Sequence, residues 1–567
     1  MRTILGIRHG HDAAASLVID GQIVADIAEE RLTRKKNDGS FPENAIRFCL
    51  DNAGITSYDL DAVAIPTTTV SPTIRTFFPG CVVGNKKNLS IKAKIRNKLL
   101  HTHPHEEEKI TLPVYYETFP VRKDCLIIPV HHHLAHASSA YYTSGLSDQK
   151  SLVVVMDGIG DGWSTSIWKG EQNNLVLLKN YDGASSLAWF YAAATEALGW
   201  RHGSDEWKTM GLAPYGNPNP GALDGYYPEF KNGVLTKKHD FGEPWRFPDH
   251  GCNHYHLDDA KRLKEKVQEL GRENFAAEVQ RVVEEQAEEL IYPWLEKEST
   301  RNLCCAGGFF LNVKFNQKVW YSGNVDYQWT FPNPGDPGLP AGVALYVYYQ
   351  NNRHIPSKKL PDLYLGPQYN NPEIRKILDE RKISYSYHDD IEQKTAQLLA
   401  DNKIVAWFQG RMESGPRALG NRSILMSPLR AENKDIINAC VKYREAFRPF
   451  TPSLIYEKAE DYLVNAREEF FMVTSFIARN EVKNRIPAVI HVDGTSRPQM
   501  VQKNTNPRYY DLISRFGNIT GEYVLLNTSF NVKGEPIICN PREAIKCFYD
   551  TGLDALVLGN YLIRKTE

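Results

Sequence analysis

Two stretches of the chain share one pattern of apolar and polar positions. In the first, an apolar run at 4–7 is followed by a polar loop, a strand-like segment, the turn Asp20-Gly21 and a third strand. In the second, an apolar run at 152–156 is followed by a polar loop, a strand-like segment, the turn Lys169-Gly170 and a third strand through Leu178. Both stretches therefore predict the same motif of strand, polar loop, strand, glycine turn and strand.

The repeat predicts a duplicated core in the N-terminal part of the chain. A duplicated RNase H-like core with a polar loop after its first strand is the plan of actin-like ATPases, in which the two loops face each other across a nucleotide cleft. Apolar positions spaced by three or four residues predict a long amphipathic helix from Phe275 to Trp294. The run Leu303–Ala306 then predicts a buried strand, with Cys304 and Cys305 in the core.

The pattern changes after a polar segment with two prolines at 352–366. Beyond it helical and strand-like stretches alternate, which predicts an α/β second domain. The helices are expected at 391–402 and 541–550, and the strands at 404–408, 523–526 and 555–558. We therefore expect two domains, 1–355 and 356–567.

Composition and charge narrow the class of protein. The 567 residues are 42% apolar and 24% charged, and the formal net charge is -1, so no global field attracts nucleic acid or a membrane surface. No apolar stretch reaches the roughly 20 residues of a membrane span, and the N-terminus has no signal-peptide core. The nine cysteines lack a framework spacing, which favours a reducing cytoplasm. A basic and then His-rich stretch at 86–109 is interpreted as a solvated connector in preference to a metal site.

Two histidines and two aspartates form a candidate metal centre. His132 and His136 are four residues apart, so on a helix their imidazoles share one face. Asp157 ends an apolar strand, and Asp336 lies in a Gly/Pro turn that leads into an apolar helix at 341–348. Two imidazoles and two carboxylates suit Fe(II), Mn(II) or Zn(II), whereas the lack of thiolates argues against a structural zinc site.

A glycine pair lies after the strand at 303–306. Gly307 and Gly308 precede a segment that includes Asn312 and is expected to open a helix. Glycines at such a position allow the backbone to approach a phosphate or ribose at the helix N-terminus. We interpret Gly307, Gly308 and Asn312 as nucleotide-binding residues of the N-terminal domain.

Recurring cations fixed by Gly and Pro form a candidate anion site at 409–453. The stretch holds Arg417, Lys442 and Arg448, and Arg497 adds another cation downstream. Rigid loops that present guanidinium groups suit bidentate binding of phosphate or carboxylate. The polar segment 527–531, which follows an apolar strand, offers hydroxyl and amide donors.

Nine short motifs, in order from residue 11 to residue 531, carry a resemblance to a known family. They are His11-Asp12-Ala13-Ala14-Ala15, Ala28-Glu29-Glu30-Arg31, His132-His133-Leu134-Ala135-His136, Met210-Gly211-Leu212-Ala213-Pro214, Ala306-Gly307-Gly308, Gly415-Pro416-Arg417-Ala418-Leu419-Gly420, Arg444-Glu445-Ala446-Phe447-Arg448-Pro449-Phe450, His491-Val492-Asp493-Gly494-Thr495 and Asn527-Thr528-Ser529-Phe530-Asn531. With these motifs the chain resembles the O-carbamoyltransferases that modify antibiotics and nodulation factors. The resemblance covers nearly the whole chain.

The resemblance implies a fold and a reaction for each domain. The family's N-terminal domain is similar to the actin-like, metal-dependent transferase that makes threonylcarbamoyladenosine, and its C-terminal domain is similar to the α/β synthase of threonylcarbamoyl-AMP. In the family the C-terminal domain converts carbamoyl phosphate and ATP into carbamoyl-AMP and pyrophosphate. The carbamoyl group then passes to a hydroxyl of a small-molecule acceptor in the N-terminal domain, and AMP leaves.

The family's site residues carry over by position. His132, His136, Asp157 and Asp336 match the metal ligands, with Fe2+ expected ahead of Zn2+ or Mn2+, and Mg2+ accompanies ATP. His11 matches the histidine beside the acceptor and is the candidate general base, since an imidazole can take a proton at neutral pH. The residues that match the carbamoyl phosphate and ATP pocket are Arg417, Lys442, Arg448, Arg497, Asn527 and Ser529. Arg417 and Arg497 are also taken as catalytic, because they would stabilise the charge that develops in transfer.

This chain departs from the family pattern on the acceptor side. The loop Gly203–Thr209 is longer than usual, Phe309 and Phe310 are bulkier, and the serine common two residues after Asp12 is absent. The acceptor therefore stays open, as does the oligomeric state, for which a homodimer is one option. An actin-fold small-molecule kinase or a metal-dependent hydrolase is the alternative function. A nucleotide-binding regulator without chemistry is a third.

Overall fold

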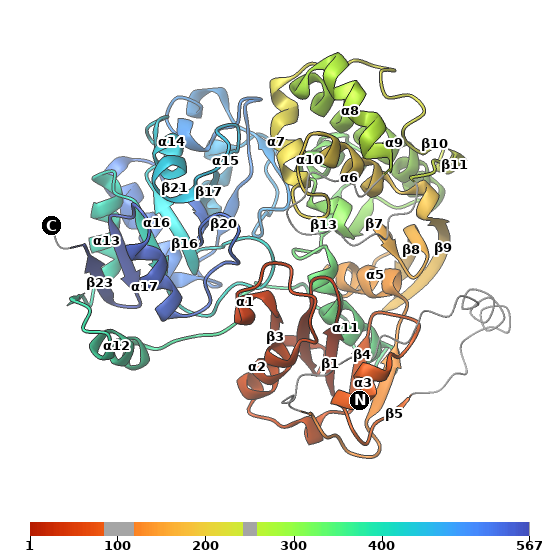
Figure 1. The fold of residues 1–567 in the computed structure, drawn as a ribbon, viewed down its shortest axis with the longest axis horizontal. Helices are drawn as coiled ribbons and strands as arrows, with labels where there is room; N and C mark the ends of the chain where they lie inside the picture. Colours follow the sequence, from red (N-terminus) through yellow and green to blue (C-terminus); the bar gives the residue numbers. More distant parts are fainter. Residues whose placement is uncertain (84–117, 242–257, 566–567) are drawn as a thin grey trace.

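The computed structural model describes residues 1–83, 118–241 and 258–565. The stretch at 86–109 that the sequence assigns to a connector lies outside these described residues. Figure 1 shows the N-terminal part, from red to green, beside the C-terminal part, from cyan to blue. In the described ranges no helix combines the length and the apolar character that crossing a lipid bilayer requires.

The N-terminal part contains two sheets with the same strand order. In each sheet a three-stranded antiparallel meander continues into parallel strands. The first sheet has the order β3 (Gln22–Ala28), β2 (Ala14–Ile19), β1 (Thr3–Arg8), β4 (Ala62–Ile65), β6 (Leu126–Pro129) and β5 (Val82–Val83). The second has the order β13 (Tyr327–Thr330), β12 (Asn302–Ala306), β7 (Ser151–Gly160), β8 (Trp163–Glu171) and β9 (Asn174–Asp182). The predicted duplication and actin-like fold are confirmed.

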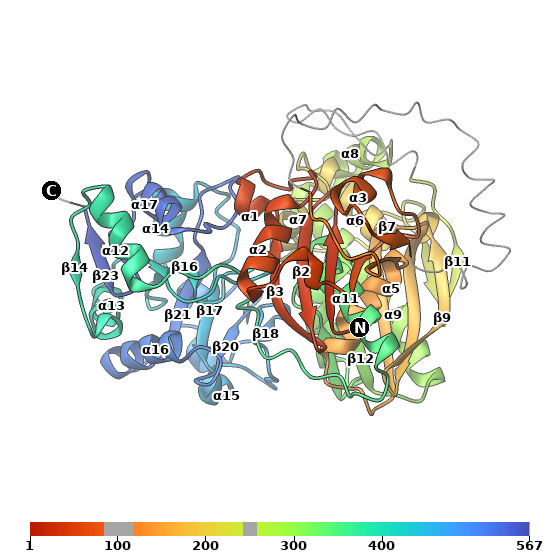
Figure 2. The ribbon, with the colours of Figure 1, turned by 90° about the horizontal axis from the view of Figure 1, so that it is seen from below.

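Two helices lie between these sheets. Helix α11 (Leu339–Asn351) packs on β1 and β2, and α5 (His132–Thr143) packs on β7 and β12, while the two helices also pack on each other. The view in Figure 2 shows α5 and α11 among the strands of the N-terminal part. This arrangement brings the start of α5, the end of β7 and the start of α11 together, which is where the predicted metal ligands lie.

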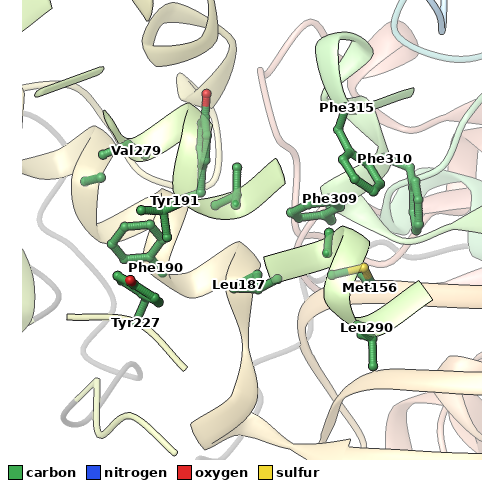
Figure 3. Packing of buried hydrophobic residues seen from close by; sticks show 14 of the residues in the cluster. Met156, Leu187, Phe190, Tyr191, Tyr227, Val279, Leu290, Phe309, Phe310 and Phe315 are labelled. Carbon is green, nitrogen blue, oxygen red and sulfur yellow. The ribbon is translucent and has the colours of Figure 1, made fainter. Parts of the chain in front are cut away.

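Helices on the other face of the second sheet form a large apolar core. The predicted amphipathic helix is α9 (Arg272–Lys297), which packs with α6 (Leu187–Ala197) and α8 (Asp258–Leu270). Figure 3 shows the aromatic packing of this core, with Phe190, Phe309, Phe310 and Phe315 among its labelled residues. Met156 also belongs to this core and directly precedes Asp157, so buried packing fixes the strand that carries a predicted ligand.

Two turns of the second hairpin differ from the prediction. Strand β7 runs on through Asp157 to Gly160, and the chain reverses at Asp161-Gly162, both with positive φ. Lys169-Gly170 is not a turn, because β8 continues to Glu171 and the reversal comes at Gln172-Asn173, with φ of 49° and 54°. Gly170 is there for packing: a Cβ atom at this position would lie 2.5 Å from the Tyr141 ring.

The C-terminal part is built on one mixed eight-stranded sheet, so the predicted α/β class is confirmed. Its strand order is β14 (Ser386–Tyr387), β23 (Tyr561–Arg564), β22 (Ala555–Leu558), β15 (Val405–Phe408), β16 (Arg422–Met426), β21 (Val524–Ser529), β17 (Thr451–Ile455) and β20 (Gln499–Val501). Its longer helices are α12 (Asn371–Glu380), α13 (Ile391–Ala400), α16 (Pro507–Thr520) and α17 (Pro541–Tyr549). Between α11 and α12 the chain has neither helix nor strand, as the polar segment at 352–366 predicts.

Candidate functional site

The two histidines and two aspartates predicted as metal ligands lie together. His132 and His136 are one turn apart at the start of α5, Asp157 lies on β7, and Asp336 opens a short 3-10 helix before α11. One candidate ligand atom from each residue lies within 4.8 Å of the others. The Nε2 atom of His132 is 3.3 Å from Asp157 Oδ2 and 3.5 Å from Asp336 Oδ1.

The charges of this tetrad fit a divalent cation. Burial raises the pKa of Asp157, but the hydrogen bond with His132 and the charges of both imidazoles outweigh it and lower this pKa to about 2. Burial likewise opposes ionisation of Asp336, yet the charges of Arg8 and His132 keep its pKa well below the usual value. His136 Nε2 is buried and has no hydrogen-bond partner in the part of the chain that the structure describes. Two imidazoles and two carboxylates form a donor set that suits Fe(II), Zn(II) or Mn(II). A buried imidazole nitrogen without a hydrogen-bond partner fits a metal ligand in this set.

Backbone and side-chain groups around the tetrad hold the carboxylates in place. The Gly308 N–H donates to Asp157 Oδ1 at 3.0 Å, and the Arg8 guanidinium donates to Asp336 Oδ2 at 2.8 Å. The backbone N–H of His132 donates to Asp161 at 3.0 Å, which fixes the first turn of α5. Each carboxylate therefore has one oxygen engaged by the protein and the other directed to the histidines.

His11, the predicted general base, lies on the loop between β1 and β2. This loop begins at Arg8, which contacts Asp336, so it borders the tetrad. The Nε2 atom of His11 is 3.1 Å from Asp12 Oδ2, and half of the His11 side chain is exposed. An imidazole with this exposure is accessible to a ligand that enters from solvent.

The predicted nucleotide-binding glycines have clear structural roles. Gly307 has a φ of +101°, and a Cβ atom there would lie 2.1 Å from the carbonyl oxygen of Met156, so only glycine fits. Gly308 opens the short helix Gly308–Leu311 and positions Asp157 through its N–H. The Asn312 side chain caps α10 (Val313–Tyr321) and also pairs with Gln280. Gly307 and Gly308 lie beside the tetrad. Contact of Gly307, Gly308 and Asn312 with a nucleotide remains a prediction.

The predicted anion-binding residues gather at one end of the C-terminal sheet. Ser423 at the start of β16 pairs with Ser529 at the end of β21, and Thr451 at the start of β17 pairs with Asn527. Strand β20 runs parallel to β17 and starts level with Ser453. The segments that precede β16, β17 and β20 therefore converge with the end of β21. These segments carry Arg417, Arg448 and Arg497.

Four cations of this cluster have no carboxylate within 4.0 Å among the residues that the structure describes. They are Arg417, Lys442, Arg444 and Arg497. Burial, then the charges of Arg417 and Arg444, lower the pKa of Arg497 well below its usual value. Burial alone lowers the pKa of Arg417 to about 10. Lys442 is buried and the three arginines are half-buried. Cations that are shielded from water without a compensating charge are costly, so such a cluster indicates a site for a polyanion.

Polar atoms of β21 and of the segment just after it complete this anion site. Lys442, which is 3% exposed, donates from Nζ to the carbonyl oxygen of Ser529 and to the carbonyl and side-chain oxygens of Asn531. Burial and the charges of Arg444 and Arg448 lower the pKa of Lys442 well below its usual value. The side-chain oxygen of Asn527 is buried and accepts no hydrogen bond from any described residue.

The structure adds two arginines to the predicted sites, Arg444 and Arg8, and shows a structural role for a third, Arg422. Arg444 packs on the Phe450 ring at 4.4 Å within the cationic cluster, and burial lowers its pKa to about 9. Arg8 was not predicted, although a cation at the end of a strand just before His9-Gly10-His11 is a visible signal. By contrast, the fully buried Arg422 donates to four carbonyl oxygens and stacks on Phe408, so it supports the fold.

Two family models together match most of the chain. The model described as Carbamoyltransferase N-terminus matches residues 3–345, and the model described as Carbamoyltransferase C-terminus matches residues 396–565. An uncharacterized protein of Synechocystis is 34% identical, with 100% of this chain and 97% of that protein covered. The nodulation protein NolNO of Sinorhizobium fredii is 33% identical over 98% of this chain and 79% of its own length.

Solved structures match more weakly. Full-length HypF in its phosphate- and nucleotide-bound form has 13% identity and a TM-score of 0.32, covering 61% of this chain and 55% of that chain. A ROK family glucokinase from Streptomyces griseus has 12% identity and a TM-score of 0.27, covering 60% of this chain and 98% of that chain.

Proposed function

The chain belongs to the carbamoyltransferase family and is a carbamoyltransferase enzyme, and from this premise we propose that it transfers carbamoyl groups to a hydroxyl through carbamoyl-AMP. The donor reaction would use the cationic cluster of the C-terminal domain, 356–567. The transfer would use the His/Asp tetrad of the N-terminal domain, 1–355. The acceptor is a hydroxylated small molecule, and the class that we favour is a secondary metabolite.

The donor half uses carbamoyl phosphate and ATP, with Mg2+ on the nucleotide. Water first releases phosphate from carbamoyl phosphate, and an oxygen of the resulting carbamate then attacks the α-phosphorus of ATP. The bond to the β-phosphate breaks, so carbamoyl-AMP forms and pyrophosphate leaves. Arg417, Lys442, Arg448 and Arg497 would bind the phosphates and stabilise the charge on the transferring group.

The single observation that carries the proposal is the group of four cations that have no carboxylate partner within the described residues. A site for one small monoanion would not need Arg417, Lys442, Arg444 and Arg497 together, since each further cation adds repulsion. Carbamoyl phosphate and a nucleoside triphosphate supply enough negative charge to compensate them. Asn527, whose buried side-chain oxygen lacks a partner, would accept a hydrogen bond from the donor's amide group.

The transfer half takes place on the other side of the domain boundary. The acceptor oxygen attacks the carbamoyl carbon of carbamoyl-AMP, the bond to the phosphate oxygen breaks, and AMP leaves. His11 accepts the hydroxyl proton; because its Nε2 atom faces Asp12, Nδ1 is the nitrogen that is left for this role. A divalent metal held by His132, His136, Asp157 and Asp336, for which we favour Fe2+ over Zn2+ or Mn2+, would supply Lewis-acid and template chemistry.

Product analysis tests this proposal. The purified enzyme is incubated with ATP, carbamoyl phosphate and candidate hydroxylated acceptors, and the nucleotide products are separated and quantified. We expect AMP and pyrophosphate in equal amounts, together with an acceptor whose mass gains one carbamoyl group. ADP in place of AMP would instead support the actin-fold kinase, and acceptor hydrolysis without any nucleotide product would support the metal-dependent hydrolase.

A further inference from the structure

An aromatic ring of the N-terminal domain covers one arginine of the cationic cluster. Trp207 lies on α7 (Glu206–Leu212), and the Cζ atom of Arg448 is 3.3 Å from the centroid of its ring. This distance places the planar guanidinium group directly over the indole. Such a stack attracts the cation electrostatically and holds the guanidinium in one plane.

A carboxylate shared between the domains fixes the same arginine from one edge. Glu445 accepts from Arg448 at 3.3 Å and lies 3.5 Å from the Nζ atom of Lys208, the residue after Trp207. Lys208 also pairs with Asp205 at 2.9 Å. The segment from Asp205 to Lys208 therefore holds Arg448 both through a ring and through an ion-pair chain.

The contact is part of a packed domain boundary. The Phe447 ring, next to Arg448, lies 5.9 Å from Trp200 and 6.5 Å from Tyr215, both in the N-terminal domain. The Arg448 Nε atom is buried and has no hydrogen-bond partner among the described residues, and 14% of the Arg448 side chain is exposed. With one edge on Glu445 and one face on Trp207, part of the guanidinium still has hydrogen-bonding capacity for an anion.

We propose that Trp207 is a positioning residue for the donor site, which acts through Arg448 from across the domain boundary. The inference rests on the proposed function, in which Arg448 binds a donor phosphate. The acceptor domain then completes the donor site. The guanidinium is already oriented before the phosphates arrive, so the side-chain entropy that anion binding would otherwise lose is smaller.

The test combines kinetics with direct anion binding on the full-length enzyme. Pyrophosphate release is measured without acceptor, and the affinity for inorganic pyrophosphate is measured by calorimetry. For Trp207→Ala we expect the KM for carbamoyl phosphate and the Kd for pyrophosphate to rise roughly tenfold, with kcat changed less than twofold. Trp207→Phe should restore most of the affinity, because a phenyl ring still stacks on a guanidinium. This rescue also shows that the Ala variant's defect is not a folding defect.

A double-mutant cycle assigns the effect to Arg448. If Trp207 acts through Arg448, Trp207→Ala should add little in an Arg448→Ala background. The matched control is Trp320→Ala, which removes another tryptophan–arginine contact between the domains, with Arg467 at 5.2 Å. This control should leave the donor KM unchanged.

The outcomes separate this inference from the proposed function. Unchanged pyrophosphate affinity in Trp207→Ala, or effects of the two mutations that simply add, would overturn the positioning role while pyrophosphate release remains intact. Wild-type enzyme that binds pyrophosphate through Arg448 and Trp207 but releases none from ATP would instead contradict the proposed function and leave the positioning role supported. Wild-type enzyme that does not bind pyrophosphate would overturn the inference.

Discussion

Arg8 and Asp336, which are 328 residues apart in the chain, form an ion pair at 2.8 Å beside the His/Asp tetrad. Arg8 engages Oδ2 of the carboxylate, while Oδ1 lies 3.5 Å from His132 and 3.6 Å from His136. The ion pair therefore occupies one oxygen of Asp336 and leaves the other directed toward the two histidines. Arg8 also directly precedes the loop that carries His11, so the same ion pair connects the candidate base to the candidate metal centre.

The first prediction concerns this ion pair. Arg8→Met leaves Asp336 free to rotate, and loss of a residue that orients a metal ligand weakens metal affinity by roughly 10- to 100-fold. We expect metal content after dialysis, measured by mass spectrometry, to fall accordingly, while pyrophosphate release from ATP stays intact. The control is Arg122→Met, which removes a surface ion pair with Asp61. Full metal content in Arg8→Met would contradict this role.

The second prediction separates the two half-reactions at the tetrad. His136→Ala removes one of four proposed ligands, so bound metal and carbamoylation of the acceptor should be lost. Pyrophosphate release should continue, because the cationic cluster lies in the other domain. Substitution of the exposed His354 by Ala provides a control in which neither activity changes. A His136→Ala enzyme that still carbamoylates its acceptor would refute the metal role.

The third prediction concerns a variant that loses the donor reaction and keeps its metal. Arg497→Ala removes a half-buried guanidinium that has no carboxylate partner in the described part of the chain, and pyrophosphate release should fall roughly a hundredfold or more, because a phosphate loses a charge-assisted donor. Metal content should not change. The exposed Arg542, which pairs with Glu380 at the surface, supplies the control substitution. Normal pyrophosphate release from Arg497→Ala would remove this residue from the donor site.

The fourth prediction is that the enzyme takes up a proton when it binds the donor phosphates. Burial and two neighbouring cations depress the pKa of Lys442, whereas a bound phosphate favours its charged form and raises that pKa. Between the lower pKa of the free enzyme and the higher pKa of the complex, binding therefore takes up as much as about one proton. Calorimetry of pyrophosphate binding over a series of pH values, in two buffers with different ionisation enthalpies at each pH, measures this uptake.

Lys442→Met provides the comparison for that measurement. The methionine variant should bind more weakly and take up fewer protons than the wild type. Equal binding enthalpies in both buffers for the wild-type enzyme would mean that Lys442 is already charged before the anion arrives.

The sequence predicted what depends on local pattern. The duplicated hairpins, the helix that carries His132 and His136, and the strand before Asp157 follow from apolar periodicity and from spacing along one helix face. The predicted turn at Lys169-Gly170 was wrong, because a glycine inside an apolar pattern can indicate either a turn or a close packing contact. Here the Tyr141 ring needs the space that a side chain would fill, and no local pattern reveals a ring that comes from another element.

The contacts between distant segments could not be predicted from the sequence. Arg8 meets Asp336, and Trp207 meets Arg448, only because the two domains and the two sheets pack in one particular way. A single sequence contains the charges but not their pairing. For the same reason the sequence does not distinguish Arg422 from Arg417. Arg422 donates its hydrogen bonds to backbone carbonyl oxygens, whereas Arg417 has no ion pair among the described residues.

One measurement tests the central claim most directly. Labelled pyrophosphate is incubated with the enzyme, ATP and carbamoyl phosphate without any acceptor, and the label in ATP is followed. Reversible formation of carbamoyl-AMP predicts that label enters ATP, that it does so only when carbamoyl phosphate is present, and that Arg497→Ala abolishes it. No exchange under these conditions, with ADP as the nucleotide product, would contradict the adenylate route.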